Sequence, residues 1–252
     1  MGEMHLSKHL EGYDKDLAEV VLGIAEVSKD ISRGFITHQG KADTSNFYGD
    51  QQAAMDIWAD DLFIKELGDS GLVRYLASEE QPEVLEFEPN TDLAVSIDPL
   101  DGSSLLSINL TVGTIVGIQR GSVLKPGSEM VGAMYILYGP LTVLVYTLGD
   151  GVHEFVLNTD GDFVLRKENL TIGSEKRLGQ GAARNTYLPF HEEFISTLEA
   201  DGYKIRFSGS FVADVHQILH KGGVFTYPGY QGSERGKLRL LFECAPMGYI
   251  VT

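Results

Sequence analysis

The sequence predicts a layered α/β protein, and three patterns along the chain indicate it. Two amphipathic helix patterns come first, a series of strand patterns follows from about residue 72 to 167, and helices alternate with strands beyond about residue 173. The chain has 252 residues, of which 43% are hydrophobic and 22% charged, an ordinary composition for one or two globular domains. We therefore expect one region over residues 1–172 and a second α/β region over residues 173–252.

The helices near the start are predicted from their apolar spacing. In residues 14–35, apolar side chains recur at steps of three and four, which predicts an amphipathic helix. A polar loop is expected over residues 38–49, and a second helix over 50–71, with Asp50 as its N-cap and Gly68 as its stop. Asp60 and Asp61 are expected on the solvated face of this helix. Its apolar side would consist of Met55, Trp58, Leu62 and Phe63.

Short apolar runs predict the strands. They lie at residues 72–78, 93–97, 111–119, 130–139, 141–148, 152–158 and 163–167, and glycine-containing turns at 149–151 and 159–162 join the last three. Beyond residue 173, the patterns predict a helix over 190–202, a strand over 203–209, a helix over 210–223 and a strand over 224–228. His216 and His220 have the spacing of a zinc helix but lack its glutamate, so we expect a partly exposed helix face there.

Charge and composition exclude several classes of function. The chain has 36 acidic against 20 basic residues, a formal net charge of −16, and it has no basic run of the kind that binds nucleic acid. An anionic membrane surface is disfavoured for the same reason, and no apolar run approaches the roughly 18 residues of a membrane span. One cysteine excludes an intrachain disulfide and a cysteine-based zinc cluster. We expect a cytoplasmic protein with no nucleic-acid or membrane partner.

The strongest chemical signal is a group of acids that follow predicted buried strands. Glu79 and Glu80 come after one strand, and Asp98 and Asp101, within DPLDGSS, come after the next. If these strands are neighbours, their carboxylates meet at one sheet edge and cannot all stay ionised without cations. Mg²⁺ or Mn²⁺ suits such oxygen ligands, and the Leu100 carbonyl can supply one further, neutral oxygen ligand. In the loop expected between Asp98 and Asp101, Pro99 adds stiffness. Gly102, Ser103 and Ser104 then present N–H and hydroxyl groups that suit phosphate oxygens.

These motifs also mark a resemblance that covers nearly the whole chain. The sequence resembles the fructose-1,6-bisphosphatase and sedoheptulose-1,7-bisphosphatase family, and it looks closer to the sedoheptulose branch than to the animal fructose bisphosphatases. The runs that carry the resemblance include GDQQAAMDIWADDL, ASEE, DPLDGSS, GAMYILYGPLTVLVY and GKLRLLFECAPMGY. The resemblance implies a layered αβαβα sugar-phosphatase fold whose C-terminal end is shortened here. It also implies a homo-oligomer, a dimer or a tetramer.

The resemblance further implies the reaction. The family hydrolyses the C1 phosphate of a ketose bisphosphate, fructose 1,6-bisphosphate or sedoheptulose 1,7-bisphosphate, in gluconeogenesis or the Calvin cycle, with two or three Mg²⁺ ions, or Mn²⁺ in their place. Two alternatives stay open from the residues. One is an inositol- or nucleotide-phosphate phosphatase of the same superfamily. The other is a catalytically silent phosphosugar-binding regulator.

Family roles transfer to matching positions of this chain. The metal ligands implied are Glu79, Glu80, Asp98, the Leu100 carbonyl, Asp101 and Glu243. The implied catalytic acids are Asp56 and Glu80, which hold and deprotonate the attacking water, and Asp50, on a loop that engages the site. The implied substrate contacts are Asp101, Gly102, Ser103, Ser104, Arg184, Arg206, Tyr227, Lys237 and Arg239, with Arg206 reaching across a subunit interface.

The chain also departs from the family pattern. Phe207 stands where animal enzymes have a tyrosine, and Gly181 stands where they have an asparagine that binds the distal phosphate, so Arg184 is the substitute contact. Glu243 lies in an apolar run, where an unpaired charge is costly, so a cation or Arg239 should accompany it.

Overall fold

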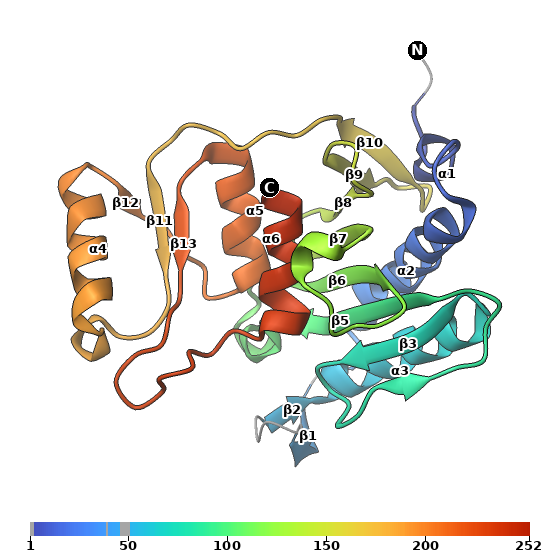
Figure 1. Ribbon diagram of the computed structural model, residues 1–252, viewed down its shortest axis with the longest axis horizontal. Helices are drawn as coiled ribbons and strands as arrows, with labels where there is room; N and C mark the ends of the chain where they lie inside the picture. Colours follow the sequence, from blue (N-terminus) through green and yellow to red (C-terminus); the bar gives the residue numbers. More distant parts are fainter. Residues whose placement is uncertain (1–2, 39, 46–50) are drawn as a thin grey trace.

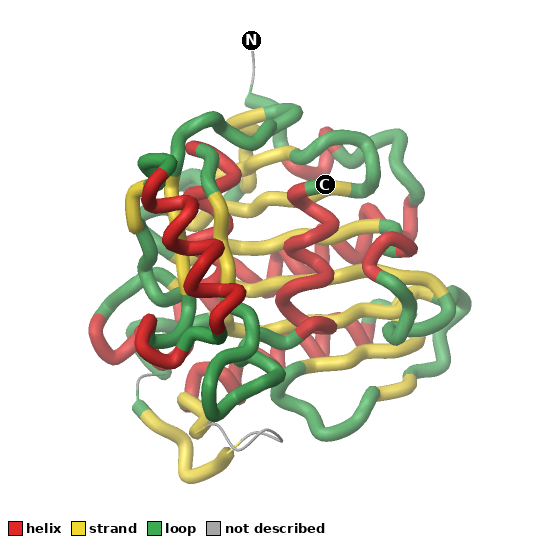
Figure 2. The backbone as a smooth tube through the Cα atoms, turned by 60° about the vertical axis from the view of Figure 1, so that its left-hand side comes forward, coloured by secondary structure: helices red, strands yellow, loops and turns green. Residues whose placement is uncertain are grey.

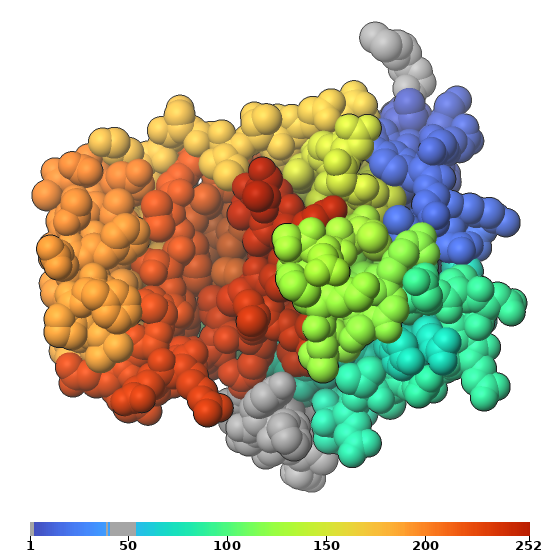
Figure 3. Space-filling model, viewed as in Figure 1, coloured from blue at the N-terminus to red at the C-terminus, as the bar shows by residue number. Residues whose placement is uncertain are grey.

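The computed structural model describes residues 3–38, 40–45 and 51–252, and these form five alternating layers (Figures 1 and 2). Helices cover one face of a large sheet, two further helices cover its other face, and a small sheet and one more helix complete the stack. This is the αβαβα arrangement expected from the sequence. Seen from one side, residues beyond about 173 fill one half of the molecule and the earlier residues fill the other (Figure 3). No described helix is both long enough and apolar enough to cross a membrane.

The large sheet has eight strands in the order β10-β9-β8-β7-β6-β5-β3-β4. Its neighbouring strands are antiparallel except for β3 and β5, which run parallel. Its strands are β3 (Val73–Ser78), β4 (Leu85–Glu86), β5 (Leu93–Asp101), β6 (Val112–Arg120), β7 (Gly132–Tyr138), β8 (Thr142–Thr147), β9 (His153–Leu157) and β10 (Phe163–Lys167). The central strands are buried along almost their whole length because helices cover both faces of the sheet, and this is why their sequences are mostly apolar.

The first helical layer contains α1 (Leu6–His9), α2 (Lys15–Gly34) and α3 (Ala54–Asp69). Asp14 caps α2 as its carboxylate accepts hydrogen bonds from the N–H groups of Asp16 and Leu17. The predicted start of the second helix is wrong. Residues 51–53 instead form strand β2 (Gln51–Ala53), which pairs with β1 (Lys41–Ser45) inside the segment expected to be a loop, so α3 begins at Ala54. Asp50 lies outside the described residues.

The opposite face of the large sheet carries α5 (Phe211–Lys221) and α6 (Ala245–Val251). Beyond α5 lies a parallel three-stranded sheet in the order β12-β11-β13, built from β11 (Arg177–Gln180), β12 (Lys204–Ile205) and β13 (Val224–Thr226). Helix α4 (Pro189–Ala200) packs on this small sheet through the apolar cluster of Leu178, Tyr187, Ile195 and Leu198. The α/β alternation expected beyond residue 173 is therefore present.

Two histidines of α5 meet an acid of the large sheet. Glu154 on β9 is fully buried, and its Oε2 lies 2.5 Å from Nε2 of His220. The Nδ1 atom of His216 lies 2.8 Å from the hydroxyl oxygen of Tyr135, and Arg166 pairs with the second oxygen of Glu154. The expected helix face is therefore half-buried, and it joins α5 to the sheet through a polar cluster.

This cluster predicts a loss of stability in acid. Burial, followed by the nearby charge on His220, lowers the pKa of His216 to about 4, although Glu154 acts in the opposite direction and Arg166 adds to the lowering. Between the usual pKa of about 6.5 and pH 4, the unfolded chain binds a proton that the folded chain does not, so stability falls as pH falls through this window. We expect His216→Gln to reduce the acid-induced loss by about 1–3 kcal/mol, measured by urea unfolding at pH 7 and pH 4.5. Equal pH slopes for both proteins would contradict this assignment.

Candidate active site

The acids singled out in the sequence lie at the carboxyl ends of the parallel strands β3 and β5. Ser78, the last residue of β3, is in register with Ile97 on β5, and the N–H of Glu79 donates to the Ile97 carbonyl at 3.0 Å. Asp98 directly follows Ile97. Glu79 and Glu80 therefore leave β3 beside the point where Asp98 and Asp101 end β5, which is where ligand sites of α/β sheets form.

A β-bulge aligns Asp98 with Asp101. Residues 98–101 were expected to form a loop, but they continue β5 and are buried. Asp98 pairs with Ile115 and Asp101 with Gly113, so three steps on β5 match two steps on β6. In a regular strand these two aspartates would point to opposite faces, and the one extra residue turns them to the same side. Proline fits at such an irregularity because the N–H that it lacks is not needed in the ladder.

Asp101 is held by the start of α5. Its Oδ2 accepts hydrogen bonds from the Ser210 hydroxyl at 3.0 Å and from the Val212 N–H at 2.8 Å. Ser210 is fully buried and also caps the helix by accepting from the N–H of Ala213. Sequence reasoning missed Ser210. A serine before an amphipathic helix signals an N-cap, but no local pattern shows which distant carboxylate it contacts.

Glu243 enters the cluster from the other side, on a short π-helical turn (Leu240–Cys244) before α6. Its carboxylate accepts a hydrogen bond from the backbone N–H of Arg239. The Nε of Arg239 lies 3.7 Å from Oε1 of Glu79. Arg239 thus contacts two of the predicted ligands, one through its backbone and one through its guanidinium, as the apolar surroundings of Glu243 led us to expect.

Asp98, Asp101 and Glu243 each place one ligand oxygen within 4.8 Å of the other two. All three are buried. Burial raises the pKa of Glu243 to about 8 and that of Asp101 to about 6, and burial with the charges of Glu79, Asp101 and Glu243 raises the pKa of Asp98 well above its usual range. When ionised, these carboxylates repel one another, and a bound cation would offset that repulsion. Three convergent oxygens in a buried place therefore fit a hard divalent ion such as Mg²⁺.

Asp60 was expected on a solvated helix face, and that expectation is wrong. The side chain is buried, and its two oxygens accept hydrogen bonds from the Ser78 hydroxyl at 2.6 Å and from the Gln81 side-chain amide at 2.5 Å. Burial raises the pKa of Asp60, while these two hydrogen bonds oppose the increase. Asp60 thus fixes both ends of the segment that carries Glu79 and Glu80. Asp61, its neighbour on α3, is exposed as expected.

The other predicted catalytic and phosphate-binding residues that the structure describes lie on α3, in the turn after β3 and in the turn after β5. Asp56 is buried in the first turn of α3, and Glu80 lies in the turn after β3. Gly102 has φ +80°, a left-handed conformation that side chains disfavour, and it leads into a short 3₁₀ helix (Ser103–Ile108). The first N–H groups of such a helix lack partners within it, so they can face a ligand.

The predicted sugar-side residues lie in the C-terminal half. Lys237 is exposed on the segment that leads to Glu243, and its carbonyl accepts a hydrogen bond from Arg239. Arg206 is exposed beyond β12, and the Tyr227 ring stacks near Tyr230 with their centroids 6.1 Å apart. The guanidinium of Arg184 pairs with Glu192 at 2.8 Å and with Glu199 at 2.7 Å, so both carboxylates of α4 already engage it.

An αβαβα fold with buried carboxylates at parallel strand ends, next to a Gly-Ser-Ser turn, defines the class of cation-dependent sugar phosphatases. Family models described as the N-terminal and C-terminal domains of fructose-1-6-bisphosphatase match residues 3–168 and 171–252. The chain belongs to the fructose-1,6-bisphosphatase family.

Individual relatives agree with this membership. The chain is 47% identical to a protein named fructose-1,6-bisphosphatase class 1 from Methanocorpusculum labreanum, over 94% of this chain and 74% of the relative. A protein of the same name from Methanospirillum hungatei is 46% identical, over 98% of this chain and 81% of the relative. The holo form of Leishmania major fructose-1,6-bisphosphatase superposes with a TM-score of 0.93 at 30% identity, covering 100% of this chain and 86% of that chain.

Proposed function

We propose that this chain hydrolyses the C1 phosphate of fructose 1,6-bisphosphate to the monophosphate and inorganic phosphate, as a step of gluconeogenesis. One observation carries the proposal. In a chain of this family, the ligand oxygens of Asp98, Asp101 and Glu243 converge within 4.8 Å beside the Gly102 turn. Fructose bisphosphate is the substrate proposed because the curated relatives at 43–47% identity carry that name.

In this proposal, two or three divalent ions, Mg²⁺ or Mn²⁺, would be held by Glu79, Glu80, Asp98, Asp101, Glu243 and the Leu100 carbonyl. When bound, these ions supply positive charge that offsets the phosphate charge and makes water a better nucleophile at neutral pH. Asp56 and Glu80 would hold and deprotonate the attacking water, and Asp50 is the further acid proposed to engage the site.

The chain's backbone and basic residues position the ester in this proposal. The N–H groups of Gly102, Ser103 and Ser104 hold the phosphoryl oxygens while charge moves during in-line attack. Lys237, Arg239 and Tyr227 contact the sugar and its distal phosphate, and Arg184 would have to leave its α4 carboxylates to join them. Arg206 reaches the neighbouring subunit's site in a homo-oligomer.

The domain division and the location belong to the same proposal. We place the metal-binding domain at residues 1–172 and the sugar-phosphate domain at 173–252, supported by family models that meet between residues 168 and 171. A reducing cytoplasm agrees with the single cysteine.

A direct assay tests the proposed reaction. Initial rates of phosphate release on fructose 1,6-bisphosphate and on fructose 6-phosphate should differ sharply, with release only from the bisphosphate and only when Mg²⁺ or Mn²⁺ is present. Release from the monophosphate at a similar rate, or release that chelators leave unchanged, would overturn the proposal.

Gly181 provides a test of the proposed role of Tyr227. A Cβ added at Gly181 would lie 2.0 Å from the Tyr227 ring, so any side chain there must displace the ring. We expect Gly181→Ala to raise KM roughly tenfold while kcat changes little, because the ring contacts the sugar and not the phosphate that is cleaved. Gly248→Ala on α6, where nothing lies within 4 Å of the new Cβ, is the matched control. An unchanged KM for Gly181→Ala would remove Tyr227 from the site.

A further inference from the structure

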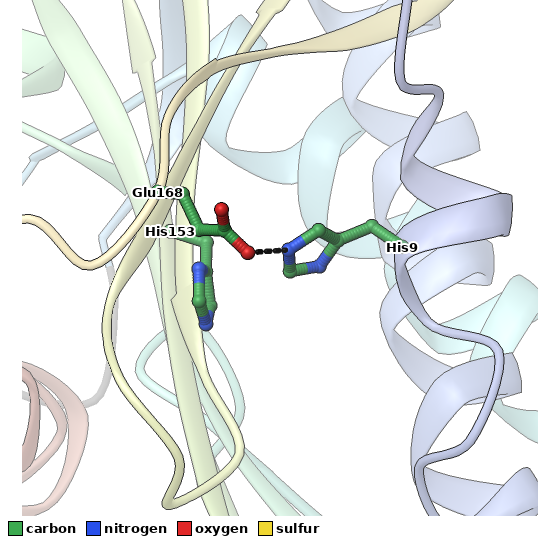
Figure 4. A group of neighbouring side chains, drawn as sticks. All are labelled: His9, His153 and Glu168. Carbon is green, nitrogen blue, oxygen red and sulfur yellow. Dashed lines mark ion pairs between the residues drawn. The ribbon is translucent and has the colours of Figure 1, made fainter.

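Two histidines and a glutamate form a second cluster, which shares no residue with the carboxylate cluster. His9 comes from α1, His153 from β9 and Glu168 from the segment directly after β10 (Figure 4). Each offers one ligand atom, and these three atoms lie within 4.8 Å of one another. None of the three has a part in the proposed hydrolysis.

Hydrogen bonds hold both imidazoles in a ligating orientation. The Nε2 of His153 lies 2.9 Å from the Asp150 carbonyl, which can only accept, so Nε2 carries the proton and Nδ1 is an acceptor. The Asn169 N–H contacts this Nδ1 at 3.5 Å, a long hydrogen bond that an ion bound to Nδ1 would replace. The Nδ1 of His9 lies 2.6 Å from the Tyr146 hydroxyl, and its Nε2 faces Glu168 at 3.7 Å. A ring whose second nitrogen is fixed by a carbonyl or a hydroxyl is the usual arrangement of a metal-bound histidine.

The distances and the access suit a transition-metal ion. Two ligands at about 2.1 Å from a tetrahedral ion lie about 3.4 Å apart, so the 3.7 Å between His9 and Glu168 needs little adjustment. His153 is buried, while the Glu168 side chain is 59% exposed, which leaves a path from solvent to the ligands.

The cluster of Glu154, His216 and His220 has the same composition but suits an ion less well. There Arg166 lies 3.3 Å from one Glu154 oxygen, and a cation at this place would meet that positive charge. The ion-pair partner of Glu168 is His9 and not an arginine, and a histidine can lose its proton and bind a cation as a neutral ligand.

We propose that His9, His153 and Glu168 bind one first-row transition-metal ion such as Zn²⁺, with a fourth position open to solvent. Imidazole and carboxylate together suit Zn²⁺ and its neighbours in the series, unlike the oxygen ligands of the carboxylate cluster, which suit Mg²⁺. The three ligands lie on separate segments, so the ion ties the N-terminal helix to the sheet edge. Because the three ligands come together only in the folded chain, the bound ion stabilises the fold.

Zinc binding to the full chain in excess Mg²⁺ tests the proposal, because the wild type and the variants below share the carboxylate cluster and differ only at the proposed ligands. We expect the wild type to bind one more equivalent of Zn²⁺ than Glu168→Gln or His9→Gln, and its melting temperature to rise with Zn²⁺ by roughly 5 °C more than theirs. Co²⁺ in place of Zn²⁺ should give the visible absorption of a four-coordinate site in the wild type and not in the variants.

The controls separate this site from others. His5→Gln changes a half-exposed histidine next to α1 and should retain the extra equivalent. Glu168 is exposed, so Glu168→Gln should fold normally and release phosphate at the wild-type rate. Equal Zn²⁺ stoichiometry and equal melting shifts for the wild type and both ligand variants would overturn the proposal, whatever the phosphatase assay shows.

Discussion

Replacing Asp98 by asparagine should reduce Mg²⁺-dependent phosphate release by at least about a thousandfold, because cation charge at this place contributes several kcal/mol to the reaction. The fold should persist. The Asp98 Oδ1 accepts the Leu100 N–H at 2.9 Å, and an asparagine oxygen can accept the same bond, so the bulge of β5 is kept. In the metal-free state, the variant should melt no lower than the wild type, because one buried acid no longer opposes its neighbours.

The measurement combines phosphate release with thermal unfolding in EDTA. Asp160→Asn is the matched control, because Asp160 lies in an exposed hairpin turn where its backbone N–H donates to Oδ1 of Asn158, a hydrogen bond that the variant keeps. That variant should retain full activity. If Asp98→Asn keeps most of the wild-type rate, Asp98 does not hold a catalytic ion.

The second large effect is expected at Asp60, which touches neither the substrate nor the ions. Asparagine at this position offers one oxygen instead of two, so its NH2 group would either meet the Gln81 amide as a second donor or force the Ser78 hydroxyl to accept instead of donate. In both cases the charge that strengthens these bonds is lost. The segment that carries Glu79 and Glu80 would then be held loosely. We expect a 10–100-fold loss of Mg²⁺ affinity or activity, the usual result of losing such a supporting contact.

The Mg²⁺ dependence of the rate distinguishes positioning from catalysis. For Asp60→Asn, the Mg²⁺ concentration that gives half the maximal rate should rise, and high Mg²⁺ should restore much of the activity. Ser78→Ala should act in the same direction, and Asp61→Asn, on the exposed side of the same helix, should have no effect. A lower rate that Mg²⁺ does not restore, with an unchanged Mg²⁺ midpoint, would show that Asp60 acts otherwise.

Local patterns were sufficient wherever one element had one buried face. The spacing from Leu17 onward specified α2 to within about a residue at each end, and the apolar runs specified seven strands of the large sheet, because side-chain periodicity follows directly from backbone geometry. The order of strands could not be read this way. Patterns do not show that β3 and β5 are parallel neighbours, although this pairing places Glu79 beside Asp98.

Sequence patterns were enough to predict the layered α/β class, the acids that a cation could join and the family to which the chain belongs. Tertiary structure alone decided that β2 replaces the start of a helix, that Asp60 is buried under Ser78 and Gln81, and that a bulge turns Asp98 and Asp101 to one side. It also decided that His9, His153 and Glu168 meet. All of these features have the same physical reason. Each feature depends on contacts between segments that are distant in sequence, and local propensities do not include the energies of such contacts.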